Sequence, residues 1–485
     1  MSWIEIGNAF LYREDELMLF HQGLFLFIFS GFLIAYSFVS NKNNWRQYLI
    51  IAFSAYFYYK ASGVFVMLLL LTVSADYVFS VWMEKTKKTW QKQSILTAGI
   101  LFSLSFLFYF KYKNFFIENV NAFIGTSYGL SELILPIGIS FYTFQSISYL
   151  VDIYGNKVAR PPFYRYLMYM MFFPHLVAGP IVRDKDFLPQ LDDDYAFSNK
   201  DLSEAIFLIL KGLVKKVIIA DFVAQYPDIV FSAPYGFSGS EHFLASLCYS
   251  LQIFCDFSGY TDMAIGIALL LGYRLGINFS SPYKAMDITE FWRRWHISLS
   301  SWLRDHIYIP LGGNRKGFFL QLLFLLCTML VGGFWHGADW KFVFWGAAHG
   351  FLLVFHKVWL RIFENRFSRG YYNVLSVLIT FFCVNLLWIP FRANSIHDAL
   401  YMYSNIFTNF SWQQFRIVIE NNQLLFLLLV FGYVCTIFPT FLKDKIIHFY
   451  YRLNLAFKLL ALIVVIQLFL QIKTTVVQPF IYFQF

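Results

Sequence analysis

The chain is poor in charged residues and has no paired cysteines. Asp, Glu, Lys and Arg make up 14% of its 485 residues, whereas a soluble globular domain carries about 25%. None of the five cysteines stands in a Cys-x-x-Cys pair, and most lie in apolar stretches. This pattern excludes a disulfide framework and predicts no metal site.

The N-terminus lacks the features of a cleaved signal peptide. Its apolar run from Leu24 to Val39 is long, acidic residues precede it, and no small-x-small site follows. We therefore interpret this run as a first membrane helix. The net charge of +9 does not indicate a nucleic-acid partner, because the basic residues fall in short loops between apolar runs, as orientation signals do.

Apolar and aromatic residues dominate the composition of the chain. Hydrophobic residues make up 58% of the chain, with 60 Phe and 32 Tyr, which is typical of a helical bundle with aromatic interfacial belts. We expect an all-α polytopic membrane protein that forms one domain over residues 1–485, with roughly 10 to 13 transmembrane or re-entrant helices. The apolar segments are 20–39, 47–59, 62–82, 94–110, 132–151, 165–182, 202–223, 242–272, 318–335, 342–356, 373–390, 421–441 and 454–472.

Residues 280–317 form the largest interruption of this pattern. Basic residues outnumber acidic ones there, so the positive-inside rule predicts a cytoplasmic block. A stripe with helical spacing runs from Ile288 to His306 and is rich in Trp, which predicts a helix lying at the membrane interface. His296 is one residue off the stripe and faces either a reaction chamber or water and headgroups.

Charge counts give a sidedness for the later segments. The loop 357–369 is also basic, so the two runs between it and residues 280–317 must cross out and back. That places His336 toward the outer side. Continuing the parity puts the loop with Lys443 inside and the C-terminus outside.

His336 stands in a glycine-rich break between two strongly hydrophobic runs. The run before it, Phe318 to Trp335, has 18 residues and spans roughly 27 Å as a helix. Ionisable groups at membrane depth are costly and are functional candidates. From this fragment alone, a histidine that hydrogen-bonds between helices is an equal alternative. Asp256 and Asp262 also lie in an apolar stretch, and we favour a role in pinning helices together over a role in lining a tunnel.

The motifs of the chain resemble those of the membrane-bound O-acyltransferases. More narrowly, they are similar to the bacterial branch that acylates cell-envelope polymers by alginate O-acetylation, peptidoglycan O-acetylation and teichoic-acid D-alanylation. The resemblance covers about residues 20–485. Its motifs are Phe291–Asp305 (FWRRWHISLSSWLRD), Ile309–Arg315 (IPLGGNR), Phe334–Gly337 (FWHG), Pro136–Phe141 (PIGISF), Phe173–Pro180 (FPHLVAGP) and Asp256–Ala264 (DFSGYTDMA).

The resemblance implies a ring of helices around a central catalytic tunnel, with His336 as the catalytic histidine and His296 as a second catalytic residue on the cytoplasmic side. The imidazole of His336 has the pKa of a general base that removes a hydroxyl proton. The donor it implies is acetyl-CoA or another acyl thioester, and no tightly bound cofactor. Arg293, Arg294 and Arg304 would steer a phosphorylated donor, or else act as topology signals and lipid contacts.

The C-terminal aromatic tail, residues 474–485, is a second site. It resembles the end of the small partner protein in teichoic-acid D-alanylation, in which a tyrosine is proposed to carry the acyl group. The resemblance implies that Tyr482 is catalytic, and the alternative is an interfacial aromatic anchor.

We therefore expect a multi-pass O-acyltransferase of the bacterial inner membrane. It would pass an acyl group, acetyl in the first instance, from a cytoplasmic thioester to the outer side for O-acetylation of an envelope polysaccharide. Its partners would be membrane lipids, the cytoplasmic acyl donor and an extracytoplasmic transferase of the SGNH type. The alternatives are an acyltransferase for a lipid or protein acceptor, and a transporter without acyl chemistry.

Overall fold

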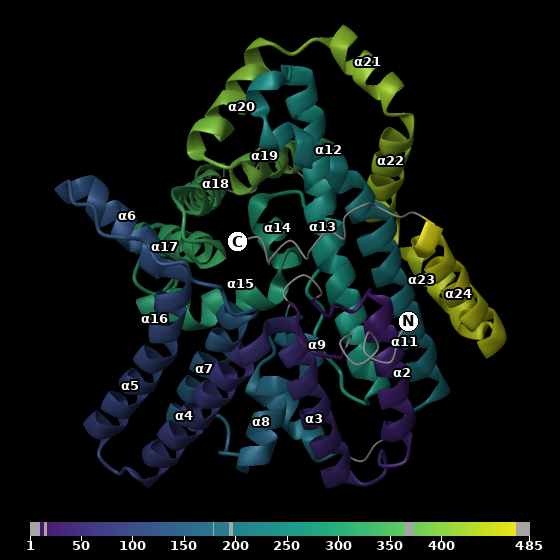
Figure 1. The fold of residues 1–485 in the computed structure, drawn as a ribbon. Coiled ribbons are helices and arrows are strands. Elements are labelled where there is room, and N and C mark those ends of the chain that lie inside the picture. The colour runs from purple at the N-terminus through teal and green to yellow at the C-terminus, as the bar shows by residue number, and fades with distance from the viewer. Residues whose placement is uncertain (1–9, 14–16, 178, 194–196, 364–372, 472–485) are drawn as a thin grey trace. The chain divides into compact units, whose positions relative to one another are not determined.

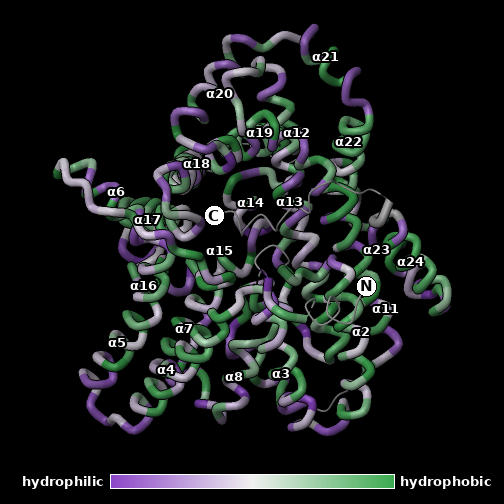
Figure 2. The backbone as a smooth tube through the Cα atoms, in the orientation of Figure 1, coloured by the Kyte–Doolittle hydropathy of each residue, from purple (hydrophilic) through white to green (hydrophobic). Residues whose placement is uncertain are grey.

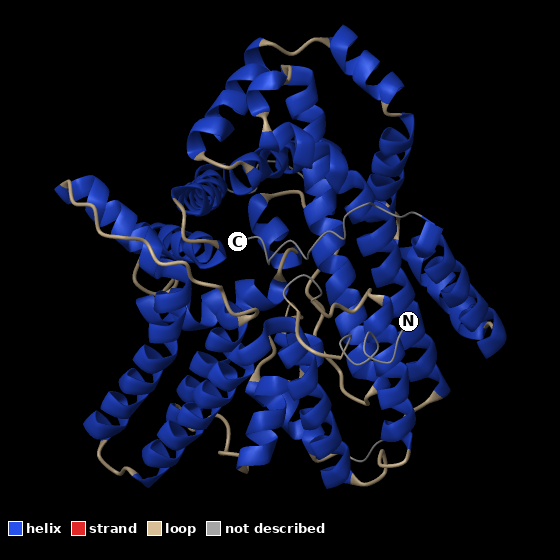
Figure 3. Ribbon diagram, in the orientation of Figure 1, coloured by secondary structure: helices blue, strands red, loops and turns tan. Residues whose placement is uncertain are grey.

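The regular secondary structure of the described chain is helical throughout (Figures 1 and 3). The computed structural model describes residues 10–13, 17–177, 179–193, 197–363 and 373–471, and no strand occurs in these ranges. The expected all-α class is confirmed.

Six helical stretches are long and apolar enough to cross a membrane, or up to eight if each of two bent pairs forms one span. In Figure 2 hydrophobic residues dominate the long helices, whereas polar residues gather at turns such as that between α4 and α5. The chain is thus a multi-pass membrane protein. The range of 10 to 13 expected from the sequence also counted apolar segments that form shorter helices. The six are Asn44–Lys85, Thr89–Ile124, Gly239–Leu270, Phe318–His336, Trp340–Phe363 and Val374–Arg392; the bent pairs are Trp412–Asn421 with Gln423–Ile437 and Phe441–Arg452 with Leu455–Gln467.

The chain divides into two compact units, residues 1–205 with 263–276 and residues 206–262 with 277–485. Two helices, α11 (Asn199–Leu213) and α13 (Gly239–Leu270), cross the division in sequence. The helices of the first unit before α11 are α2 (Gly23–Ser37), α3 (Asn43–Ser62), η1 (Gly63–Phe65), α4 (Val66–Lys85), α5 (Thr89–Leu107), η2 (Phe108–Tyr112), α6 (Lys113–Ile124), α7 (Ile139–Tyr154), α8 (Phe163–Met171), α9 (Phe173–Leu176), α10 (Asp184–Phe187) and η3 (Leu188–Leu191).

The core of the first unit is built on a helix interruption. The segment 165–182 breaks at Phe172, whose ψ of 102° separates α8 from α9. Phe173 then packs among six phenylalanine rings of the N-terminal segments, the nearest being Phe53 at 4.9 Å between centroids. His175 is buried behind the break, where its Nδ1 lies 3.0 Å from the Gln145 amide nitrogen. The Leu-Val-Ala-Gly-Pro stretch that follows His175 in the sequence is a broken-helix pattern, which predicts that the histidine packs at a helix interruption.

The second unit holds the remaining helices. They are η4 (Val214–Ala220), α12 (Asp221–Ser232), η5 (Pro234–Gly236), η6 (Pro282–Lys284), α14 (Ile288–Arg294), α15 (Ile297–Leu303), η7 (Arg304–Tyr308), α16 (Ile309–Leu311), α17 (Phe318–His336), α18 (Trp340–Phe363), α19 (Asn373–Arg392), α20 (Ile396–Thr408), α21 (Trp412–Asn421), α22 (Gln423–Ile437), α23 (Thr440–Arg452) and α24 (Leu455–Gln471).

The block 280–317 differs from the single interfacial helix that the Trp-rich stripe predicts. The stripe is divided between α14 and α15, two short helices separated by a break at Trp295 and His296. Asp287 begins α14 by accepting a hydrogen bond from the Glu290 backbone N–H at 2.8 Å, which satisfies one of the open donors of the first turn. The tryptophans of the stripe are buried in this unit rather than spread along a surface.

Candidate active site

Helices α17 and α18 approach each other through glycine. A Cβ placed on Gly333 would lie 2.3 Å from the Phe342 carbonyl oxygen, and one on Gly346 would lie 2.4 Å from the Met329 carbonyl oxygen. Small residues allow such close contact between membrane helices. The contact sets the position of His336, which is the last residue of α17.

His336 is buried among aromatic rings. Its imidazole lies 4.9 Å from the ring of Trp335, 5.1 Å from that of Trp345 and 5.2 Å from that of Phe391, between centroids and in edge-to-face geometry. Only 4% of the residue is exposed. The imidazole is therefore enclosed by aromatic side chains.

His296 is fully buried at the break between α14 and α15. It adopts a left-handed backbone conformation, with φ of 43° and ψ of 55°, which is uncommon outside glycine and is held only by strong surroundings. Those surroundings include two backbone hydrogen bonds, from Ile297 N–H to the Asn278 carbonyl and from Ser280 N–H to the Arg294 carbonyl, both of 3.0 Å.

The Asn278 side chain sets the tautomer of His296. Its Oδ1 accepts from the backbone N–H of Ser298 at 3.1 Å and lies 3.2 Å from His296 Nδ1. Because this oxygen only accepts, Nδ1 carries the proton and Nε2 of the neutral ring carries the lone pair. Burial lowers the pKa of His296 to about 3, so the ring stays neutral near pH 7. Of the two alternatives for His296, the one that placed it among water and headgroups is therefore wrong.

His349 is a third buried histidine, on α18. Its Nδ1 accepts a hydrogen bond from the Trp292 indole N–H at 3.3 Å, so the neutral ring carries its proton on Nε2. This bond joins α14 to α18. In the described residues neither His349 Nε2 nor the Trp345 indole nitrogen has a hydrogen-bond partner.

The three histidines are linked through two tryptophans. His296 lies 6.0 Å from the ring of Trp335, which also contacts His336. His349 lies 4.6 Å from the ring of Trp345, and the Trp345 ring also contacts His336. The structure thus brings the two predicted histidines to one indole ring and adds His349 to the group.

No catalytic role was predicted for His349 from the sequence, although its place in an apolar stripe was a signal for one. Phe342, Trp345, His349 and Leu353 are buried at helical spacing on α18. A histidine inside such an apolar stripe has to find a polar partner or serve a reaction. The Asn278 contact had no comparable signal, because it depends on a turn 18 residues before His296.

The three predicted donor-binding arginines do not converge in the structure. The Arg294 guanidinium pairs with Glu290 at 2.7 Å, and Arg304 pairs with its neighbour Asp305 at 2.8 Å. Arg293 is exposed. In the described part of the chain no hydrogen bond or ion pair connects any of them to His296. Their assignment to a donor stays a prediction.

Carboxylates of α13 pair with lysines on the preceding helices, in agreement with the helix-pinning role. Asp262 pairs with Lys211 at 2.9 Å and with Lys215 at 2.7 Å. Asp256 pairs with Lys216 at 2.8 Å, and Lys216 also pairs with Asp221. These contacts fasten α13 to α11 and to the π-helical turn η4.

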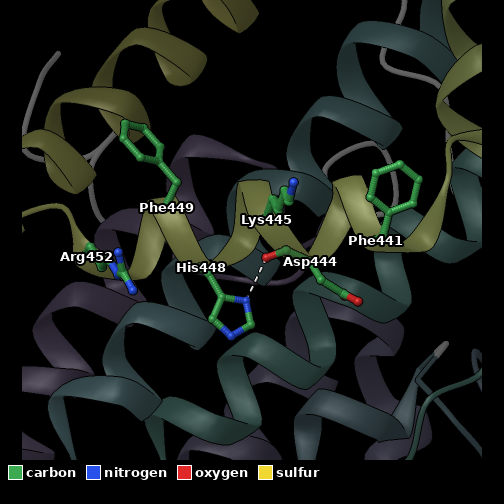
Figure 4. A pocket seen from close by; sticks show the side chains of 6 residues that line it. All are labelled: Phe441, Asp444, Lys445, His448, Phe449 and Arg452. Atoms are coloured by element: carbon green, nitrogen blue, oxygen red, sulfur yellow. Dashed lines mark hydrogen bonds between the residues drawn. The ribbon is translucent and has the colours of Figure 1, made fainter.

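Other predicted features lie elsewhere. Tyr482 and the tail 474–485 are outside the described residues, and the central tunnel stays a prediction. A pocket on α23 is lined by Phe441, Asp444, Lys445, His448, Phe449 and Arg452, and His448 Nδ1 donates to the Asp444 carbonyl at 2.7 Å (Figure 4). This pocket includes none of the predicted site residues.

Comparisons with known proteins identify the family of the chain. The sequence profile of the membrane-bound O-acyltransferase family matches residues 51–389, which include His296 and His336. A peptidoglycan O-acetyltransferase of Helicobacter pylori is 36% identical over 415 residues, 79% of this chain and 78% of its own.

Two further relatives are similar to the chain. A probable alginate O-acetylase of Pseudomonas aeruginosa is 39% identical over 407 residues, 82% of this chain and 76% of its own. A teichoic acid D-alanyltransferase of Streptococcus thermophilus is 29% identical over 294 residues, 54% of this chain and 69% of its own. These similarities set aside the transporter alternative. The chain belongs to the membrane-bound O-acyltransferase family and is an O-acyltransferase of the branch that includes polysaccharide O-acetyltransferases.

Proposed function

We propose that the protein transfers an acetyl group from a cytoplasmic thioester, acetyl-CoA or a related donor, to the outer side of the bacterial inner membrane for O-acetylation of a cell-envelope polysaccharide. The observation that carries the proposal is the burial of His296 and His336 against one indole ring, in a chain similar to two polysaccharide O-acetyltransferases. Alginate, peptidoglycan and other exopolysaccharides all present the hydroxyl that this reaction needs.

The proposed chemistry needs one base and one hydrogen-bond donor. His336 removes the proton of the attacking hydroxyl, the oxygen bonds to the thioester carbonyl carbon, and the carbon–sulfur bond breaks to release the thiol, which takes up the proton. The Nε2–H of His349 is directed by its bond from Trp292 and is available to donate to the carbonyl oxygen as negative charge develops there.

His296 and Tyr482 would serve the two sides of the reaction. His296 presents the lone pair of Nε2 and would orient the donor. Tyr482 would accept the acetyl group as an ester of its phenol oxygen and pass it to the polysaccharide hydroxyl, so that no acetyl group is lost between the steps. An extracytoplasmic SGNH-type transferase would complete the transfer to the polymer.

Acetylation of the envelope polysaccharide in cells tests this function. Cells lacking the chromosomal copy would express wild-type protein, His336→Ala or the control His397→Ala, and ester-linked acetate released from the polysaccharide by mild alkali would be measured. Loss of a general base costs about 10²–10⁴-fold, so His336→Ala should remove the acetate.

The control separates chemistry from expression. His397 is exposed on α20 and contacts Tyr235 rather than the histidine group, so His397→Ala should acetylate normally at equal membrane abundance. Wild-type levels of acetate in cells with His336→Ala would contradict the proposal. Acetate found instead on a membrane lipid or a protein would favour the alternative acceptor classes.

A further inference from the structure

Two lysines cross-link a loop beside His296 to the turn between α22 and α23. Lys284 donates through Nζ to the Phe438 carbonyl oxygen at 2.7 Å. Lys443 reaches back from α23 to the hydroxyl of Ser281 at 3.4 Å. The two ammonium groups therefore lie on opposite sides of one junction, although 158 residues separate them in sequence. Charge counts predict that both loops are cytoplasmic.

The junction has more positive than negative charge. Lys443 is repelled electrostatically by three other lysines, and within the described ranges neither Lys284 nor Lys443 forms an ion pair. Asp262 is the carboxylate that pairs with the other two lysines, Lys211 and Lys215. We call these four side chains the lysine cluster: Lys211, Lys215, Lys284 and Lys443.

Packing contacts connect members of the lysine cluster. Lys215 Nζ lies 3.0 Å from the Ser258 hydroxyl and 5.3 Å from the centre of the Phe254 ring. That ring packs against Tyr283 at 5.6 Å, the residue before Lys284. Lys211 and Lys215 keep 38% and 21% of their side chains exposed, so both side chains are partly accessible to a ligand.

Holding several ammonium groups together costs free energy unless an anion compensates them, because like charges at short range repel each other. The nearby Arg294 does not add to the positive charge of the lysine cluster, because its guanidinium is paired with Glu290. An ammonium group offers three donors and a compact charge, which suits the tetrahedral oxygens of phosphate. Within the described residues Asp262 is the one carboxylate that pairs with the cluster, so further compensation requires an anion that these residues do not supply.

We propose that the lysine cluster is a binding site for a phosphate-bearing ligand. The loop that carries Lys284 also carries Asn278, which contacts His296, so the lysine cluster and the candidate active site are connected through one loop. Two sources have this chemistry: the nucleotide part of a thioester donor and the headgroup of an anionic lipid. The donor source rests on the proposed function, whereas phosphate binding itself does not.

Binding of coenzyme A tests the donor source without requiring turnover. Full-length protein in phosphatidylcholine nanodiscs would be titrated with coenzyme A by calorimetry, as wild type, as the double variant Lys284→Gln/Lys443→Gln and as Lys445→Gln. Because hydrogen bonds to charged groups contribute strongly to binding, the double variant should bind coenzyme A at least about tenfold more weakly. Glutamine still offers a donor to the Phe438 carbonyl, which keeps the junction closed, and the melting temperature checks this.

Lys445→Gln is the matched control, because Lys445 is exposed on the same helix two residues after Lys443 and stands over the Phe441 ring. It should bind as wild type.

In the second arm, native mass spectrometry would count phosphatidylglycerol molecules retained by each variant. Loss of phosphatidylglycerol with unchanged coenzyme A binding assigns the site to lipid headgroups.

An unchanged affinity for both ligands in a folded double variant overturns the proposal. The result is independent of the proposed function. A protein that binds coenzyme A through these lysines but never cleaves acetyl-CoA would contradict the transfer reaction. The phosphate-binding site would still be supported. Cleavage of acetyl-pantetheine, which has no phosphate, at equal rates by wild type and double variant would support both.

Discussion

Replacing Gly333 by alanine should impair catalysis through the spacing of α17 and α18. A Cβ at this position would lie 2.3 Å from the Phe342 carbonyl oxygen and 2.9 Å from Gly346 Cα. Both contacts are with backbone atoms, which cannot rotate away. Restoring an ordinary contact distance of 3.4 Å requires the two helices to move about 1 Å apart.

This displacement would separate His336 on α17 from Trp345 and His349 on α18. A misplacement of about 1 Å in an active site can cost about 10²-fold in rate, which equals about 2.7 kcal/mol in the activation free energy. Overpacking of a filled core costs about 1–3 kcal/mol in stability as well. We therefore expect a folded protein with a lower melting temperature and about one hundredth of the wild-type turnover.

The neighbouring Gly332 gives a matched control. A Cβ there would meet only the end of the Leu303 side chain, at 3.0 Å, and that side chain can rotate. Thioester cleavage by purified Gly332→Ala should be close to wild type, whereas Gly333→Ala should be strongly impaired. Wild-type turnover by Gly333→Ala, or equal loss in both variants, would refute the idea that helix spacing sets the site.

Three more predictions concern the sides of the membrane, pH and the tail. A cysteine at position 314, placed in a cysteine-free chain, should resist an impermeant reagent applied to intact cells, and labelling from outside would reverse the predicted sidedness. Because burial lowers the pKa of His296 to about 3 from about 6.5 in the unfolded chain, the unfolded state binds the extra proton below pH 6.5, and stability is lost as the pH falls. His296→Asn should therefore lose less melting temperature than wild type between pH 7.5 and pH 5, and equal losses would contradict this. Tyr482→Phe should abolish polysaccharide acetylation at normal abundance and remove an acetyl mass from the C-terminal peptide, whereas normal acetylation would show that the tail is only an anchor.

Local sequence patterns predicted the parts of the site that depend on local structure. The glycine-rich end of α17 marked His336, and the Leu-Val-Ala-Gly-Pro stretch after His175 marked a helix interruption beside that histidine. In each case the signal was a run of apolar residues interrupted by glycine or proline near a histidine. Such interruptions act within one helix, so they can be found without knowing what packs against that helix.

The long-range features could not be predicted in this way. The Trp-rich stripe has the spacing of one helix, but the contact of His296 with Asn278 stabilises a left-handed residue in its middle and splits it. Likewise, no sequence pattern relates Lys443 to Lys284. Both features depend on pairings between distant segments, and helical periodicity carries no information about those pairings.

Thioester cleavage by purified protein tests the central claim most directly. Wild type and His336→Ala would be placed in liposomes with acetyl-CoA labelled in the acetyl group, and envelope polysaccharide stripped of acetyl esters would serve as acceptor. We predict that wild type releases coenzyme A and moves label to the polysaccharide, and that His336→Ala is slower by about 10²–10⁴-fold. Folded wild type that leaves acetyl-CoA intact, or equal cleavage by both proteins, would contradict the account.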